Sequence, residues 1–193
     1  MALHFSSIDK TFDRVVNSKN WQILQDNFNN AKLIFLVGNG GNLAVSDHAS
    51  IDISRLTDKV AMAPGSGIIA SSIINEKSHE NWLEYWSSMY LKRLNLPLNE
   101  ILIIGFSSSG NSKNVVKALK SFHKKGASAT LISAVESTSS KEINTVTLSV
   151  NEYHTSEVCF LLLTYALIEG AGFCCPEISK ASPQSASKFD YSY

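Results

Sequence analysis

The sequence predicts an α/β protein whose parallel sheet is covered by helices on both faces, and two observations support this. Short apolar runs, typical of strands buried on both faces, alternate with longer stretches of helical periodicity along the chain. Two of these runs, 33–37 and 101–104, are each followed by a small polar loop and then by a helical pattern, which is the order of a βα unit. A chain of 193 residues is long enough to bury a substantial core in one domain.

The first half of the chain is expected to alternate between these two kinds of element. In order, they are two helical pieces within 6–31 separated by a break at 17–20, a strand at 33–37, the loop 38–42, a helix to about residue 56, a strand at 60–63 closed by Pro64 and Gly65, and helices over 66–75 and 80–93. Trp82 and Trp86 fall on the apolar side of the last of these helices and are expected in the core, not at a sugar-binding surface.

The second half continues the alternation. Its expected elements are a strand at 101–104 ended by Gly105, the loop 107–112, a helix from Ser112 to Gly126, a strand at 127–133, a threonine-rich strand at 145–150 in an outer position, and a last helix over about 154–172. That last helix is apolar on almost every side between residues 158 and 168. Because such a helix must be covered all round, we expect a partner subunit, most simply a second copy.

The serine-rich loop 107–112 lies between a buried strand and the start of a helix. A helix start offers unpaired backbone N–H groups and the positive end of a dipole, and hydroxyls beside it add further donors, which suits a phosphate. The alternative is a solvated turn in which Ser112 is the helix N-cap. The loops 38–42 and 107–112 both follow strands of a parallel sheet, so they could converge on one ligand at the carboxyl ends of those strands.

Composition argues against several classes of partner. The 17 basic and 17 acidic side chains give no net charge, so no nucleic-acid or membrane footprint is expected and any anion-binding site must be local. The longest apolar run, 158–168, is too short to span a bilayer, and no leader pattern follows Met1. The three cysteines have no metal-ligand spacing, so reduced thiols and a cytoplasmic location are expected.

Three stretches together resemble the sugar isomerase (SIS) domain, in particular its phosphoheptose isomerase branch. They are Leu-Val-Gly-Asn-Gly-Gly-Asn-Leu-Ala at 36–44, the pair His48 and Asp52, and Gly-Phe-Ser-Ser-Ser-Gly-Asn-Ser at 105–112. The resemblance covers nearly the whole chain, to about residue 169. It implies a three-layer αβα sandwich around a five-stranded parallel sheet, of flavodoxin-like type, with N-terminal and C-terminal helices used for oligomerisation. One SIS domain would occupy residues 1–178, and 179–193 would be a C-terminal tail.

The resemblance also implies a homotetramer with active sites between subunits and a phosphosugar ligand. The activity it implies is aldose–ketose isomerisation of a sugar such as sedoheptulose 7-phosphate, in the synthesis of surface-polysaccharide sugars. The positions implied for binding substrate and phosphate are Asn39, Gly40, Asn42, Asn75, Glu76, Ser107, Ser108, Ser109 and Ser112. Those implied for catalysis are His48, Asp52 and Glu157, although Glu157 suits a subunit interface at least as well.

The catalytic positions depart from the family pattern. The family has a His-x-x-x-Glu pair followed by a Gln and a His on the last helix, and in several members these four groups bind zinc. Here Asp52, Ser156 and Thr164 replace the last three, and neither hydroxyl is a good zinc ligand. We therefore expect no metal and no other cofactor, unless His79 or His154 supplies the missing imidazole. Two hypotheses stay open, an isomerase-like enzyme and a non-catalytic phosphosugar-binding or regulatory protein of the same family.

Overall fold

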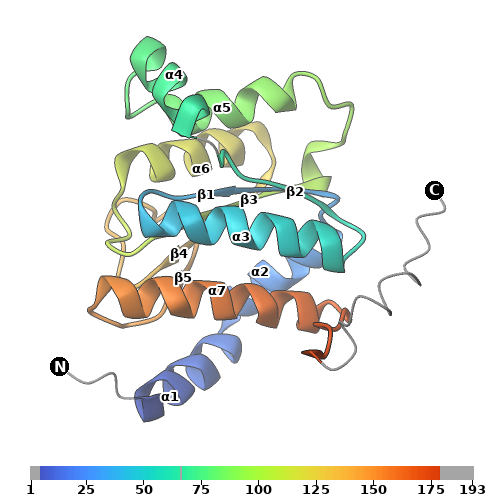
Figure 1. Ribbon diagram of the computed structural model, residues 1–193, viewed down its shortest axis with the longest axis vertical. Coiled ribbons are helices and arrows are strands. Elements are labelled where there is room, and N and C mark those ends of the chain that lie inside the picture. Colours follow the sequence, from blue (N-terminus) through green and yellow to red (C-terminus); the bar gives the residue numbers. More distant parts are fainter. Residues whose placement is uncertain (1–4, 66, 179–193) are drawn as a thin grey trace.

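The computed structural model describes residues 5–65 and 67–178, which form a sheet between two layers of helices (Figure 1). The elements in chain order are α1 (Phe5–Val16), α2 (Lys19–Asn30), β1 (Leu33–Val37), α3 (Gly41–Leu56), β2 (Val60–Met62), α4 (Gly67–Lys77), α5 (Trp82–Leu91), a 3-10 turn (Leu98–Glu100), β3 (Ile101–Ser107), α6 (Lys113–Lys125), β4 (Ser128–Ser133), β5 (Asn144–Thr147) and α7 (Tyr153–Gly170). The predicted α/β class and three layers are confirmed. The predicted tail at 179–193 lies outside the described residues.

The five strands form one parallel sheet in the order β2-β1-β3-β4-β5. The first strand, β1, lies inside the sheet. The next strand, β2, pairs with one of its edges, and β3 pairs with the other. The winding therefore reverses between β1 and β3, and ligands of such sheets bind where the carboxyl ends of two such strands separate. The loops that follow β1 and β3 are the two polar loops singled out in the sequence.

Each face of the sheet has its own apolar core. Helices α2, α3 and α7, with α1 outside them, cover one face, and α4, α5 and α6 cover the other (Figure 1). On the second face the ring of Phe35 packs edge-on against Trp86 and Phe122, with centroids 5.7 and 5.4 Å apart. Trp82 and Trp86 are 2% and 1% exposed, so their predicted core position is confirmed.

Strand β3 is longer than predicted, because Gly105 does not end it. The strand runs on to Ser107, and Gly105 pairs with Val37 in the parallel register. A Cβ atom at Gly105 would lie 2.7 Å from a methyl carbon of Val115 and 2.9 Å from one of Leu119, both on α6. Glycine is thus needed here for close helix packing, and the extension makes Ser107 the last residue of the strand.

The predicted last strand does lie at the edge of the sheet, but it ends at Thr147. Beyond it, the backbone N–H groups of Leu148 and Val150 still donate to Ser133 and Ala134, at 2.9 and 3.0 Å. Ser149 between them has φ of 60°, a left-handed conformation that interrupts the regular ladder. The remaining boundaries differ from the predicted ones by a few residues.

Helix α7 is buried on one side only in the single chain. Phe160, Leu163 and Leu167 are almost fully buried against the sheet, whereas Val158 is 58% and Leu162 is 42% exposed. Packing within one chain therefore covers only one side of the apolar surface of α7 and leaves the other side exposed. In the described part of the chain, no helix has both the length and the apolar character that crossing a bilayer requires.

Candidate functional site

The loop after β1 and the loop after β3 meet in the structure. The side-chain amides of Asn39 and Asn114 form a reciprocal pair, with both N–H to oxygen distances 2.8 Å, which joins the first loop to the first turn of α6. A second link runs from the Asn42 amide to the Ser108 hydroxyl, at 3.2 Å. Since both links cross the point where the winding reverses, the two loops form one surface at the carboxyl ends of β1 and β3.

The Ser108 side chain is buried beneath this surface, and its hydroxyl makes its hydrogen bonds within the protein. Its hydroxyl lies 2.7 Å from that of Ser156, whose own proton goes to the Tyr153 carbonyl, also at 2.7 Å. Ser108 must therefore donate to Ser156 and accept from Asn42. This chain of hydrogen bonds ties both loops to the first turn of α7, and it leaves the Ser108 hydroxyl without a proton for a ligand.

The loop has three other serines, of which Ser107 is buried at 1% exposure, Ser112 is partly buried and Ser109 is exposed. The hydroxyls of Ser107 and Ser112 lie 2.9 Å apart, and Ser109 accepts a bond from the Asn111 N–H at 3.3 Å. Ser112 stands at the N-cap of α6 but makes no side-chain capping bond, because its hydroxyl faces Ser107 instead. In the first turn of α6, the Val115 N–H donates to the Asn114 side-chain oxygen at 3.0 Å, whereas among the described residues the N–H groups of Lys113 and Asn114 are left for another acceptor, as a phosphate site requires.

The loop is held by the segment after β4, which fixes its shape. The Ser137 hydroxyl donates to the Gly110 carbonyl at 2.6 Å, and the Thr138 hydroxyl donates to the Asn111 side-chain oxygen at 3.1 Å. Gly110 has φ of 68°, a left-handed conformation that glycine adopts without strain. The shape of the serine loop is therefore held by bonds within the chain.

The start of α3 already faces an acidic side chain. A Cβ atom on Gly41 would lie 2.2 Å from a carboxylate oxygen of Glu157, so the carboxylate rests against the first turn of that helix. Negative charge is favourable there because of the helix dipole. The His154 ring, which is fully exposed, is 3.7 Å away from the same carboxylate. Glu157 therefore lies at the loop end of the contact between α3 and α7.

One polar atom at the meeting point of the loops has no partner. Asn42 is 7% exposed, and its side-chain oxygen makes no hydrogen bond among the described residues. Two other predicted residues lie away from this point. Asn75 and Glu76 are exposed on α4, and no hydrogen bond or ion pair joins them to either loop within residues 5–65 and 67–178.

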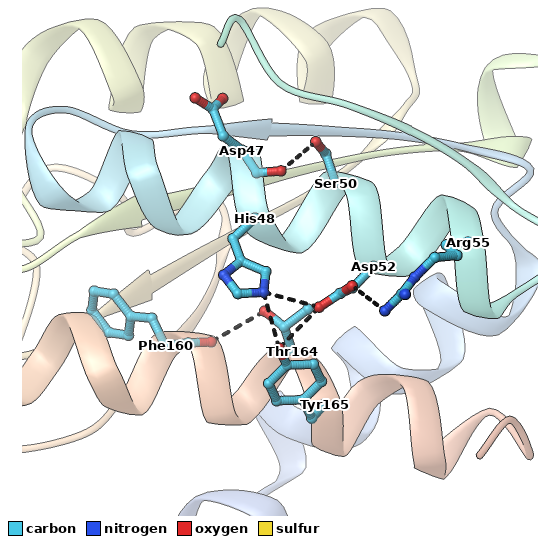
Figure 2. Close-up of polar contacts among 8 residues, drawn as sticks. All are labelled: Asp47, His48, Ser50, Asp52, Arg55, Phe160, Thr164 and Tyr165. Atoms are coloured by element: carbon cyan, nitrogen blue, oxygen red, sulfur yellow. Dashed lines mark hydrogen bonds and ion pairs between the residues drawn. The ribbon is translucent and has the colours of Figure 1, made fainter. Parts of the chain in front are cut away.

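A second polar cluster lies further along the contact between α3 and α7 (Figure 2). The Asp52 carboxylate is its centre: one oxygen is 3.0 Å from the Arg55 guanidinium, and the other is 3.1 Å from the His48 ring nitrogen Nε2. The Tyr165 hydroxyl, from α7, donates to that second oxygen at 2.9 Å and lies 3.3 Å from His48 Nε2. Asp52 is only 6% exposed, so it is a buried, fully bonded acid and not a solvated surface one.

Burial and the Asp52 carboxylate together raise the pKa of Tyr165 to about 12, burial being the larger cause. The phenol therefore keeps its proton at neutral pH and acts as a donor to Asp52.

The two clusters share one helix surface. His48 follows Gly41 by seven residues on α3, which places it about 10 Å further along the helix axis on the side that faces α7. Glu157, near the start of α7, and Tyr165, two turns later, line the opposite side of this contact. A ligand held by phosphate at the loops could thus extend along α3 toward His48.

The sequence and the fold were compared with those of known proteins. No family model matches the sequence. The phosphoheptose isomerase of Campylobacter concisus is 29% identical over 109 residues, which are 55% of this chain and 57% of that protein. The phosphoheptose isomerase of Aquifex aeolicus is 26% identical over 140 residues, 70% of this chain and 72% of that protein. The structure of phosphoheptose isomerase from Neisseria gonorrhoeae, at 19% identity, superposes with a TM-score of 0.65 over 88% of this chain and 95% of that one.

The chain is similar in sequence to two phosphoheptose isomerases, as its loops predict. It shares its fold with solved structures of such enzymes. The chain spans little more than half the length of the first of these relatives, so the comparison shows similarity and a common fold, and the activity is a separate matter.

The zinc site found in some SIS proteins does not fit the residues of this chain. The Ser156 hydroxyl is used by Ser108 and the Tyr153 carbonyl, and the Thr164 hydroxyl donates to the Phe160 carbonyl at 3.1 Å (Figure 2). Among the described residues, no three His, Cys, Asp or Glu side chains are grouped as a metal site would need. His79 and His154 are both exposed, and among the described residues no hydrogen bond or ion pair joins either to His48 or Asp52.

Two partners in the clusters, Asn114 and Tyr165, were not predicted from the sequence. Asn114 acts through a bond to Asn39, far away in the chain, and nothing in its own neighbourhood singles it out. Ser156 was noted only as the replacement of the family's Gln, and its bond to Ser108 was not predicted. Tyr165 follows the position of the family's second histidine, and that adjacency is a signal that could have pointed to it. Arg55 was visible three residues after Asp52, but its role depends on the burial of that carboxylate.

Proposed function

We propose that this protein binds a phosphosugar across the two loops and interconverts its aldose and ketose forms, as a phosphoheptose isomerase does. The convergence of the serine loop with the loop after β1, at the start of α6, is the observation that carries the proposal. The phosphate would lie at Ser107, Ser109 and Ser112, where hydroxyls and free helix N–H groups can donate to it.

The sugar would extend from the phosphate along α3 toward the second cluster. Aldose–ketose isomerisation moves a proton between C1 and C2, so it needs an acid–base group beside those carbons. The cluster around His48 and Asp52 supplies such a group, and His48 lies about 10 Å from the start of α3. A sugar phosphate of several carbons can reach both places at once.

Similarity to proteins named phosphoheptose isomerase supports this choice of substrate class. We further propose a homotetramer, because the apolar side chains of Val158 and Leu162 are exposed on α7 and the site lies on an open surface that another subunit could complete. We also propose a cytoplasmic location. The three free cysteines are consistent with one.

The deciding experiment incubates the purified protein with sedoheptulose 7-phosphate and follows formation of the aldose. Turnover that is lost in a Ser107→Ala/Ser109→Ala variant would support the proposal. If calorimetry shows that the phosphosugar binds but no turnover is found, the proposed binding site stands and the proposed isomerase activity is contradicted. Absence of both would remove the proposed function altogether.

A further inference from the structure

We infer that His48 is the side chain that exchanges protons with the substrate, and that Asp52, Tyr165 and Arg55 are positioning residues that hold its ring. The inference rests on the proposed function and assigns the roles within the second cluster. It differs from what the sequence alone suggests, which is that the carboxylate of Asp52 is the base. Bonding and exposure within the cluster lead to this assignment.

The Asp52 carboxylate has no oxygen free for a substrate. Oδ1 receives the Arg55 guanidinium, and Oδ2 receives the Tyr165 hydroxyl and faces the His48 ring (Figure 2). Its side chain is 9% exposed, whereas the His48 side chain is 55% exposed. A base must come within hydrogen-bond reach of the proton that it takes, and in this arrangement only His48 is open to a ligand.

The positions of the protons decide which nitrogen of His48 is available. The single proton of the Tyr165 hydroxyl goes to Asp52, so the phenol oxygen can only accept from His48. The carboxylate also only accepts. Both groups facing Nε2, at 3.1 and 3.3 Å, therefore present lone pairs, and Nε2 must carry the ring proton.

A neutral ring protonated at Nε2 leaves Nδ1 as a bare acceptor. Among the described residues, no hydrogen bond occupies Nδ1, and half of the side chain is exposed. The arrangement therefore presents one basic nitrogen outward. In the reaction, Nδ1 would take the proton from C1 or C2 of the sugar and return it to the neighbouring carbon, while the hydroxyl proton of the enediolate passes from one oxygen to the other through solvent, so that the ring is neutral again after each cycle.

Tyr165 connects this pair to the other helix. It is the contact from α7 that fixes the Asp52 carboxylate, while Arg55 fixes it from α3. This chain lacks the family's second histidine on α7, and a phenol one position later reaches the same pair of side chains. The cluster is thus complete without a metal ion, because the Arg55 cation already balances the charge of the carboxylate.

Nitrogen NMR of protein labelled with ¹⁵N-histidine tests the assignment without any need for turnover. At a pH about two units above the usual histidine pKa, the His48 signals, identified by their loss in His48→Gln, should show a protonated Nε2 and a bare Nδ1. Asp52→Asn should turn this single form into a mixture of both tautomers. Tyr85→Phe, which removes a phenol hydroxyl from the other face of the sheet, should change nothing. A bare Nε2 in the unchanged protein would overturn the inference.

A rescue experiment tests the substrate-facing role and separates it from the proposed function. His48→Ala should lose about 10²–10⁴-fold in turnover, and added imidazole should restore part of it, because the ring it replaces is exposed. Tyr165→Phe should lower kcat by about tenfold with little change in KM, as expected for a residue that acts through another. Imidazole that restores nothing to His48→Ala, while the unchanged protein turns over sedoheptulose 7-phosphate, would contradict the role of His48 alone. No turnover in the unchanged protein would instead contradict the proposed function.

Discussion

The two ends of the contact between α3 and α7 are built in different ways. At the loop end, the groups proposed to bind the phosphate are backbone N–H groups and short hydroxyls on loops that follow directly from the strands. At the second cluster, four long side chains from two helices depend on one another for their positions. The first kind of site is fixed by the fold and the second by particular side chains. Changes of catalytic residues can therefore accumulate at the second site while the first is retained.

The largest expected effect separates chemistry from binding. His48→Ala should reduce turnover of sedoheptulose 7-phosphate by about 10²–10⁴-fold, because the acid–base group is lost. Its affinity for the phosphosugar, measured by calorimetry, should stay within a few-fold of the unchanged protein, because His48 lies about 10 Å from the start of α3. A large loss of affinity in this variant would show that the two ends do not act independently.

The converse change should act on binding. Ser107→Ala removes one donor to the phosphate, and a hydrogen bond to a charged group contributes about 1.5–3 kcal/mol, so affinity should fall about tenfold to a hundredfold. Ser72→Ala on the exposed side of α4 is the matched control and should bind as the unchanged protein does. Equal affinity of both variants in calorimetry would place the phosphate elsewhere.

The hydrogen-bond chain beneath the loops should affect stability. Ser156→Ala removes the partner to which Ser108 donates, and a buried group left without its partner costs about 1–3 kcal/mol. The free energy of unfolding, from urea denaturation, should fall by that amount, and phosphosugar affinity should fall with it because the loop loses its anchor on α7. Unchanged stability would mean that water replaces the Ser156 hydroxyl without loss.

Metal removal should have the smallest effect. Because Ser156 and Thr164 donate their protons to backbone carbonyls and Asp52 is fully bonded, we expect no stoichiometric zinc in the purified protein and no change in activity after treatment with a chelator. Metal analysis that finds about one zinc per chain, lost in His48→Ala, would show that another side chain completes a ligand set.

The sequence was a good guide to the loop end and a poor one to the second cluster, for a physical reason. A strand, a polar loop and a helix follow one another along the chain, so their pattern can be read locally, and the serine loop was predicted on that basis. Gly105 was misread as the end of β3, because the helix that requires it, α6, packs on it from ten or more residues away. The bonds of Tyr165 and Ser156 cross 113 and 48 residues of sequence, and no local pattern encodes such pairs.

Backbone amide NMR during a titration with sedoheptulose 7-phosphate tests the central claim most directly. The claim is that the two converging loops hold the phosphate of a phosphosugar. We predict that the largest shifts fall on residues 107–113 and 38–42, followed by smaller shifts along α3 up to His48. Inorganic phosphate should shift the first two segments and leave the signals around His48 in place. Shifts confined to another surface, such as the lysine-lined side of α6 or the groove beside β5, would contradict the account.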